Sequence, residues 1–176
     1  MKQVSIFLAW MACVGLVIAS SGKTGLAADK MNYSGKYIAE ERLKTASGGE
    51  TDSTLEVVQN EGSIEVTRVE LGKKTTSRCP FNGSEGDYRS PGGVPGKCKA
   101  QLKGKYLILE SIVVARPQPT APPVREHTKE RWQLSADGKT LTIKSDVDFP
   151  DFPADISAAV ADNTSGTTKY TRTGTP

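Results

Sequence analysis

One four-residue pattern recurs along this chain and constrains its fold more than any other feature. It occupies residues 60–63, 70–73, 102–105 and 136–139, with Gly in third place each time. The flanking runs are rich in Val, Ile, Leu, Thr and aromatic residues. A Gly at this place suits a hairpin loop whose last residue has positive φ, which only Gly adopts without steric cost. Four such loops predict an antiparallel meander.

The hairpins predict an all-β fold of about eight strands that close into an up-and-down barrel, because closure removes the exposed strand edges. The expected strands are 33–44, 55–59, 64–69, 75–81, 99–102, 106–114, 125–134 and 141–147, with a weak final strand at 168–172. Tyr106–Val114 is apolar on both faces, which predicts a strand covered on both sides. Residues 82–97 are rich in Gly and Pro, which predicts no regular structure.

The N-terminus predicts an exported protein. Lys2 precedes an almost wholly apolar run, Val4–Ala19, and small residues lead to Ala28. This is the layout of a signal peptide, cleaved after Ser21 or after Ala28, and the run is short for a membrane anchor. We therefore expect a signal peptide at 1–28, a barrel domain at 29–147 and a tail at 148–176 with a short helix near 155–160. The mature protein would be periplasmic or secreted, without stable membrane insertion.

Two cysteines, Cys79 and Cys98, remain after the predicted cleavage. In an exported chain such a pair most simply forms a disulfide, and the alternative is two reduced thiols. The bridge would join the two ends of the Gly/Pro-rich loop.

The charge of the chain gives no support for nucleic-acid binding. The formal net charge is +3, and two of the positive residues, Lys2 and Lys23, lie in the predicted signal peptide. The other Lys and Arg residues are dispersed along the sequence and interleaved with Glu and Asp, which indicates an ordinary solvated surface. We expect no nucleic-acid partner, and the sequence does not identify a protein partner.

Three segments carry a resemblance to a known group of proteins: Leu55–Gly62, Gly96–Leu109 and Glu130–Ile143. In these segments the chain resembles small exported bacterial proteins with a lipocalin-like, or calycin-like, β-barrel domain. Gly35-Lys36-Tyr37 lies where a lipocalin carries Gly-x-Trp, with Tyr in place of Trp. The resemblance implies a barrel that binds a small apolar or amphipathic ligand.

Large aromatic residues are the candidates for a ligand site inside the barrel. We expect Tyr37, Tyr106 and Trp132 to point inward. The alternative is that these side chains simply fill the barrel, since small barrels are often just wide enough for side chains.

Catalytic and metal-binding patterns are weak. Gly92–Lys97 does not make a phosphate-binding loop, because Pro91 and Cys98 occupy positions that require Gly and Ser or Thr. His127 is the single histidine, and no Gly-x-Ser-x-Gly motif accompanies it. We predict no catalytic residue, no metal site and no cofactor.

An acidic segment leaves one alternative open. Its carboxylates are hard oxygen ligands that suit Ca²⁺, but their spacing does not match an EF-hand loop, so a solvated turn is the simpler interpretation. The residues are Asp146, Asp148, Asp151 and Asp155.

The sequence therefore predicts an exported, non-enzymatic barrel that binds a small ligand. One alternative is an interaction module with a filled core, acting through its disulfide-closed loop. A less favoured alternative is a small barrel enzyme.

Overall fold

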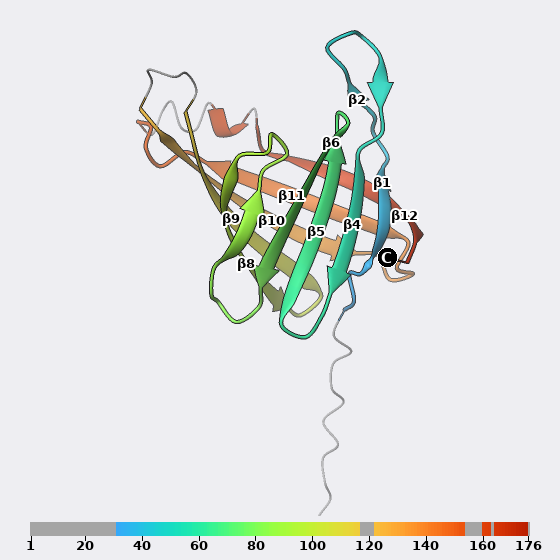
Figure 1. The fold of residues 1–176 in the computed structure, drawn as a ribbon. Helices are drawn as coiled ribbons and strands as arrows, with labels where there is room; N and C mark the ends of the chain where they lie inside the picture. The colour runs from blue at the N-terminus through green and yellow to red at the C-terminus, as the bar shows by residue number, and fades with distance from the viewer. Residues whose placement is uncertain (1–30, 117–121, 154–159, 163, 176) are drawn as a thin grey trace, which may run out of the picture.

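The computed structural model describes residues 31–116, 122–153, 160–162 and 164–175. Their main feature is a closed antiparallel barrel in which each strand pairs with its neighbours in sequence and β1 pairs with both β4 and β12 (Figure 1). The barrel strands are β1 (Gly35–Ala39), β4 (Thr54–Gln59), β5 (Ser63–Glu70), β6 (Lys73–Pro80), β7 (Gly86–Arg89), β8 (Pro95–Lys103), β9 (Tyr106–Ala115), β10 (Val124–Leu134), β11 (Thr140–Asp148) and β12 (Gly166–Gly174).

The predicted all-β barrel is confirmed, but the strand count of about eight is too low, because ten strands close the barrel. A short hairpin of β2 (Leu43–Lys44) and β3 (Glu50–Thr51) interrupts the long first strand that we expected. β12 lies within the predicted C-terminal tail, where it closes the barrel against β1. The predicted signal peptide and all but the last residue of the predicted helix at 155–160 fall outside the described residues.

The expectation that residues 82–97 lack regular structure is wrong. β7 pairs with β8 over four residues, and β8 already begins at Pro95. The glycines that suggested a loop instead allow strands to approach closely. A Cβ on Gly86 would lie 2.0 Å from the carbonyl oxygen of Arg78, and one on Gly96 would lie 2.3 Å from that of Ile112.

The turn glycines behave as expected at three of the four places. Gly72, Gly104 and Gly138 have φ of 76°, 58° and 69°. Gly62 is not among the residues with positive φ. There the side-chain oxygen of Asn60 accepts hydrogen bonds from the backbone N–H groups of Gly62 and Ser63, so an Asx turn makes the reversal instead.

The disulfide between Cys79 and Cys98 is confirmed, with a Cα–Cα distance of 5.3 Å. It connects β6 to β8 on the inner side of the barrel, past the short strand β7. β7 has one residue pair with β6, Arg78 with Asp87, so this is a weak seam in the wall. The covalent bridge holds the strands on both sides of that seam together.

Aromatic side chains fill the lower end of the barrel, the end at the turns 104–105 and 135–139. Tyr33 crosses this end, and its hydroxyl donates hydrogen bonds to the carbonyl oxygens of Lys105 and Trp132. The rings of Tyr33 and Trp132 meet edge to face at 6.5 Å, and neither residue is exposed. The lower end is therefore packed with protein side chains.

The inner face becomes more exposed toward the upper end, where the turn at 71–72 and the β2–β3 hairpin lie (Figure 1). Along β10, Trp132 and Glu130 are buried, whereas Thr128 and Glu126 are half-buried. The outer face of β9 is uncovered, with Ile112 and Val114 39% and 54% exposed. The predicted coverage of this strand on both sides is wrong, because a closed barrel has a single wall.

No helix in the described part of the chain is long and apolar enough to cross a membrane.

Candidate binding sites

The three predicted ligand-binding aromatic residues lie on different faces of the barrel. Tyr37 and Trp132 are fully buried and point inward. Tyr106 points outward, because it alternates with the buried Leu107 and its ring lies 5.4 Å from the guanidinium of the exposed Arg131. The expectation that Tyr106 lies inside is wrong. The apolar residues of β9 gave no indication from sequence of which face was the inner one.

The polar groups of Tyr37 and Trp132 are already occupied by the protein. The Tyr37 hydroxyl donates to the carbonyl oxygen of Tyr33 at 2.8 Å and accepts a hydrogen bond from Arg172. The indole N–H of Trp132 donates to Glu130 at 2.9 Å. Both side chains are thus part of the filled core, and their predicted role in ligand binding stays a prediction.

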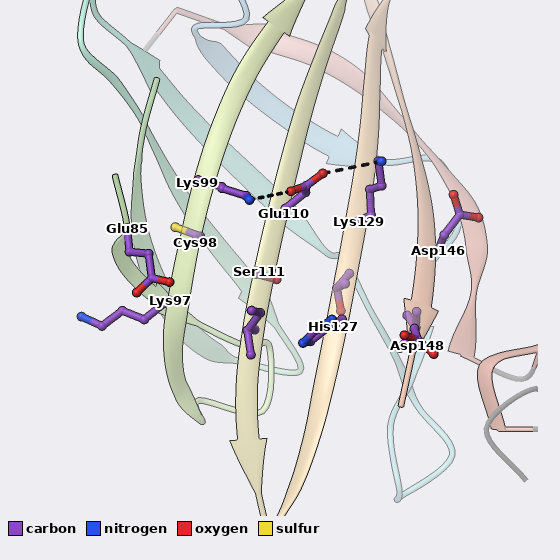
Figure 2. Close-up of a pocket in the computed structure, with 13 residues that line it drawn as sticks. Glu85, Lys97, Cys98, Lys99, Glu110, Ser111, His127, Lys129, Asp146 and Asp148 are labelled. Atoms are coloured by element: carbon purple, nitrogen blue, oxygen red, sulfur yellow. Dashed lines mark ion pairs between the residues drawn. The ribbon is translucent and has the colours of Figure 1, made fainter. Parts of the chain in front are cut away.

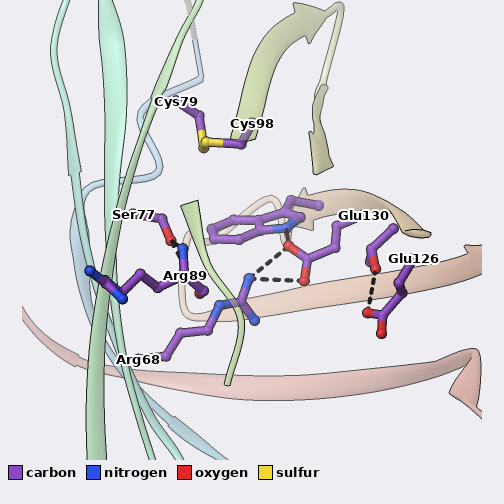
Figure 3. Close-up of polar contacts among 9 residues, drawn as sticks. Arg68, Ser77, Cys79, Arg89, Cys98, Glu126 and Glu130 are labelled. Carbon is purple, nitrogen blue, oxygen red and sulfur yellow. Dashed lines mark hydrogen bonds and ion pairs between the residues drawn. A yellow bond between two sulfur atoms is a disulfide. The ribbon is translucent and has the colours of Figure 1, made fainter. Parts of the chain in front are cut away.

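Arg68 and Glu130 form a buried ion pair (Figure 3), which lies next to Trp132. Nη2 of Arg68 on β5 donates to both carboxylate oxygens of Glu130 on β10, at 2.9 and 2.7 Å. The guanidinium also lies 5.8 Å from the centre of the Trp132 ring. Burial alone would lower the pKa of Arg68, but its charge interactions together, with that of Glu130 the largest among them, outweigh burial and the pKa is raised.

The ion pair leaves hydrogen-bond donors unused. Nε and Nη1 of Arg68 have no hydrogen-bond partner among the described residues, and its side chain keeps 11% exposure. The phenol groups of Tyr88 and Tyr170 lie close enough to be influenced by its charge, and burial raises the pKa of both. No motif in the sequence predicts this cluster. Its only signal was that Arg68 and Glu130 continue the inward alternation of Ile64, Val66 and Trp132.

The inner face at the upper end carries more acid than base. Glu70 and Glu126 point inward and are half-buried, and Lys73 is the exposed inward base on β6. The Arg68–Glu130 pair adds no net charge. An anionic group would therefore be repelled at this end of the barrel interior.

A hollow of about 450 Å³ crosses the outer face of β8, β9, β10 and β11 (Figure 2). Its floor is a row of four residues paired from strand to strand, Cys98, Ser111, Thr128 and Val147. Their side chains point into the barrel, so the floor on the outside is backbone. We call this hollow the groove.

Two rows of outward side chains form the sides of the groove. Each row runs straight across the four strands, because the residues in it are register partners. The row nearer the upper end is Lys97, Ile112, His127 and Asp148, and the other row is Lys99, Glu110, Lys129 and Asp146. Together they offer three cations, three acids, one imidazole and the exposed Ile112 side chain.

The charges in the groove are largely paired with each other. Glu110 lies between Lys99 and Lys129, with N–O distances of 3.2 and 3.5 Å. Partial burial raises the pKa of Glu110, but its hydrogen bonds and charge interactions with the two lysines bring the net pKa below its usual range. Lys97 forms an ion pair with Asp87 at 3.0 Å. The groove therefore has polar sides without a strong net field.

His127 lies in the groove between Ile112 and Asp148, and its ring has no hydrogen bond to any described residue.

The acidic residues near the C-terminus do not converge on one place that could hold a metal ion. Asp146 lies 3.9 Å from Lys144, and Asp151 forms a close ion pair with Arg125 that lowers the pKa of Asp151 to about 2. No group of three potential metal ligands is found in the described ranges. Asp155 lies outside them.

The comparisons with known proteins find likeness among solved structures. No family model matches the chain, and no curated protein matches it. The solved structure of zebrafish ileal bile acid-binding protein with cholic acid has a TM-score of 0.46 and 18% sequence identity, covering 81% of this chain and 97% of the zebrafish chain. The barrel assignment rests on the strand pairings themselves.

Proposed function

We propose that this protein is a non-enzymatic barrel that binds a small amphipathic ligand without net charge, and that the groove holds it. One observation carries the proposal: the groove is a hollow of about 450 Å³ whose sides combine paired charges with an apolar residue, Ile112. Its volume lies within the usual range for small-molecule sites, about 300–1,000 Å³.

The composition of the groove sides sets the class of ligand. Exposed apolar surface at Ile112 favours burial against an apolar part of the ligand, at about 25 cal/mol per Å². The backbone N–H and C=O groups of the floor are hydrogen-bonded between strands. Hydrogen bonds to a ligand must therefore come from the side chains. Lys99, Glu110 and Lys129 hold each other in place and offer donors and an acceptor, which suits hydroxyl or amide groups better than a single charge.

The two ring nitrogens of His127 add hydrogen-bonding groups to the upper side of the groove. No nucleophile hydrogen-bonded to His127 is present among the described residues, which supports a role in binding over a catalytic role.

The barrel interior is a second candidate for the same function. The unused donors of Arg68 favour a ligand with hydrogen-bond acceptors, and the half-buried Glu126 favours one without negative charge, so a neutral ligand would suit this site. The two sites are distinguishable because Trp132 lies inside, next to Arg68, whereas Ile112 lies outside.

A dye titration tests both sites. The probe is an environment-sensitive apolar dye, and the protein carries Trp10→Phe so that Trp132 is the remaining tryptophan. For the groove we expect stoichiometric binding that falls at least tenfold in Ile112→Asp, with unchanged Trp132 emission. Val114→Asp, an exposed residue on the same strand outside the groove, is the matched control.

The outcomes separate the hypotheses. Binding that quenches Trp132 and resists Ile112→Asp assigns the ligand to the barrel interior. No saturable binding to the folded protein refutes the ligand-binding function and leaves the interaction-module alternative.

Export of the protein remains part of the proposal. We expect N-terminal sequencing of the mature protein from its host to begin after Ser21 or Ala28. An intact N-terminus, or lipid on Cys13, would contradict cleavage by this route.

A further inference from the structure

The outer wall below the groove has a different charge from the groove itself. Eight outward positions on β8–β11 form two further rows of register partners, with no acid among them. These positions are Gln101, Ile108, Arg131, Lys144, Lys103, Tyr106, Gln133 and Thr142. Lys105 extends the set in the adjoining turn. We call Lys103, Lys105, Arg131 and Lys144, with Tyr106 among them, the basic patch.

Two of these cations are placed unfavourably as long as no anion is bound between them. Arg131 and Lys144 are register partners on β10 and β11, so like charges lie directly opposite each other on the same face. Such pairs destabilise a sheet by a fraction of a kcal/mol. The nearest acid to Lys144 is Asp146 at 3.9 Å, and Lys103, Lys105 and Arg131 have no ion-pair partner among the described residues.

Tyr106 holds two of the cations in place. Nζ of Lys105 lies 5.5 Å and the guanidinium of Arg131 5.4 Å from the centre of its ring. Its register partner on β8 is Lys103, which is exposed. Cation–π contacts of this kind orient long side chains that would otherwise move freely, and they leave the N–H donors available.

We infer that the basic patch binds a phosphate ester group with more than one negative charge. A compact dianionic group compensates several cations at once, which a single carboxylate does not. The planar fork of Arg131 suits two oxygens of a phosphate, and the lysines add point charges. The flanking Gln101 and Gln133 are uncharged donors. This site is separate from the groove and does not depend on the proposed ligand there.

Titration with tripolyphosphate tests the inference on the full chain. We expect saturable binding by calorimetry that weakens as salt rises, because exposed charges are screened. Arg131→Gln with Lys103→Gln should weaken binding at least tenfold. The matched control is Arg42→Gln with Lys36→Gln, which removes the same charge from exposed places outside the groove and the patch and should change binding less than twofold.

A second arm identifies the source of the phosphate. Vesicles that contain phosphatidic acid, a phosphate monoester that can carry two negative charges, are compared with phosphatidylcholine vesicles and with free inositol hexakisphosphate. Patch-dependent binding to the anionic vesicles alone identifies a lipid headgroup, and patch-dependent binding to the free phosphates identifies a soluble ester. Equal losses in the patch and control variants, or no binding to any probe, overturn the inference. Ile112→Asp, which tests the groove, should leave the phosphate binding unchanged.

Discussion

Removing the Glu130 carboxylate should be among the most damaging single changes in this protein. Glu130→Ala deletes two contacts from Arg68, at 2.9 and 2.7 Å, and one from the indole of Trp132 at 2.9 Å. The two side chains of the ion pair are only 11% and 7% exposed, so water does little to replace the lost carboxylate. Leaving one partner of a buried pair unpaired costs about 3–5 kcal/mol. We expect a loss of about 4 kcal/mol in unfolding free energy.

A double variant distinguishes the free-energy cost of leaving Arg68 unpaired from the net contribution of the ion pair to stability. Arg68→Met with Glu130→Leu removes both charges, and such exchanges are often close to neutral. The Trp132 N–H still loses its acceptor, which costs about 1–3 kcal/mol. The double variant should therefore be more stable than Glu130→Ala by about 1–3 kcal/mol, whereas additive side-chain losses would make it less stable.

The assay is urea unfolding at neutral pH, followed by Trp132 emission in a Trp10→Phe background with the disulfide intact. Glu56→Ala is the control, since Lys36 and Glu56 form an exposed pair at 3.8 Å and such pairs contribute at most about 1 kcal/mol. Equal effects of Glu130→Ala and Glu56→Ala would show that water reaches the pair, and the reasoning from burial would fail.

Three further predictions concern the wall and the closed end. Replacing both Cys79 and Cys98 by Ala should cost about 3 kcal/mol, from the closure of a loop with a sequence separation of 19, and thermal unfolding under oxidising conditions measures it. Gly96→Ala should destabilise the protein more than Gly92→Ala, because its Cβ would meet a backbone oxygen at 2.3 Å, and their urea midpoints should differ accordingly. Burial raises the pKa of Tyr33 to about 12. The unfolded chain ionises first, near 10, so unfolding free energy should fall between about pH 10 and pH 12, and less so in Tyr33→Phe.

The barrel could be predicted because hairpin signals are local. Each turn glycine and its flanking alternation lie within a few residues, and Gly72, Gly104 and Gly138 adopt the expected positive φ. β7 was not predicted because glycine occurs both in flexible loops and in strands whose backbones approach closely. Gly86 and Gly96 stand where neighbouring backbones leave no room for a Cβ, and in sequence they look the same as glycines of a flexible loop.

The sites were harder to predict because they depend on register across strands that are distant in sequence. Arg68 meets Glu130 across 62 residues. The half-buried place of His127 in the groove depends on its pairing with both Ile112 and Asp148, which lie on other strands. Alternation gave two faces for each strand. For β9, which has apolar residues on both faces, it did not say which face was inside, and the wrong placement of Tyr106 followed from that.

Register also explains how a chain with interleaved charges acquires separate charged regions. Along β10, Lys129 and Arg131 are two residues apart and both point outward. Lys129 belongs to a row that contains Glu110 and Asp146, whereas Arg131 belongs to a row that contains Ile108 and Lys144. Shifting β11 by two residues against β10 could bring Asp146 opposite Arg131 and compensate the charge of that residue of the basic patch. The register is held by the packing of Trp132 and Leu134 against Ile143 and Leu141 on the inner face. The packed core thus determines the charge pattern of the outer surface, and a variant that loosened this packing should weaken phosphate binding without changing a single charge.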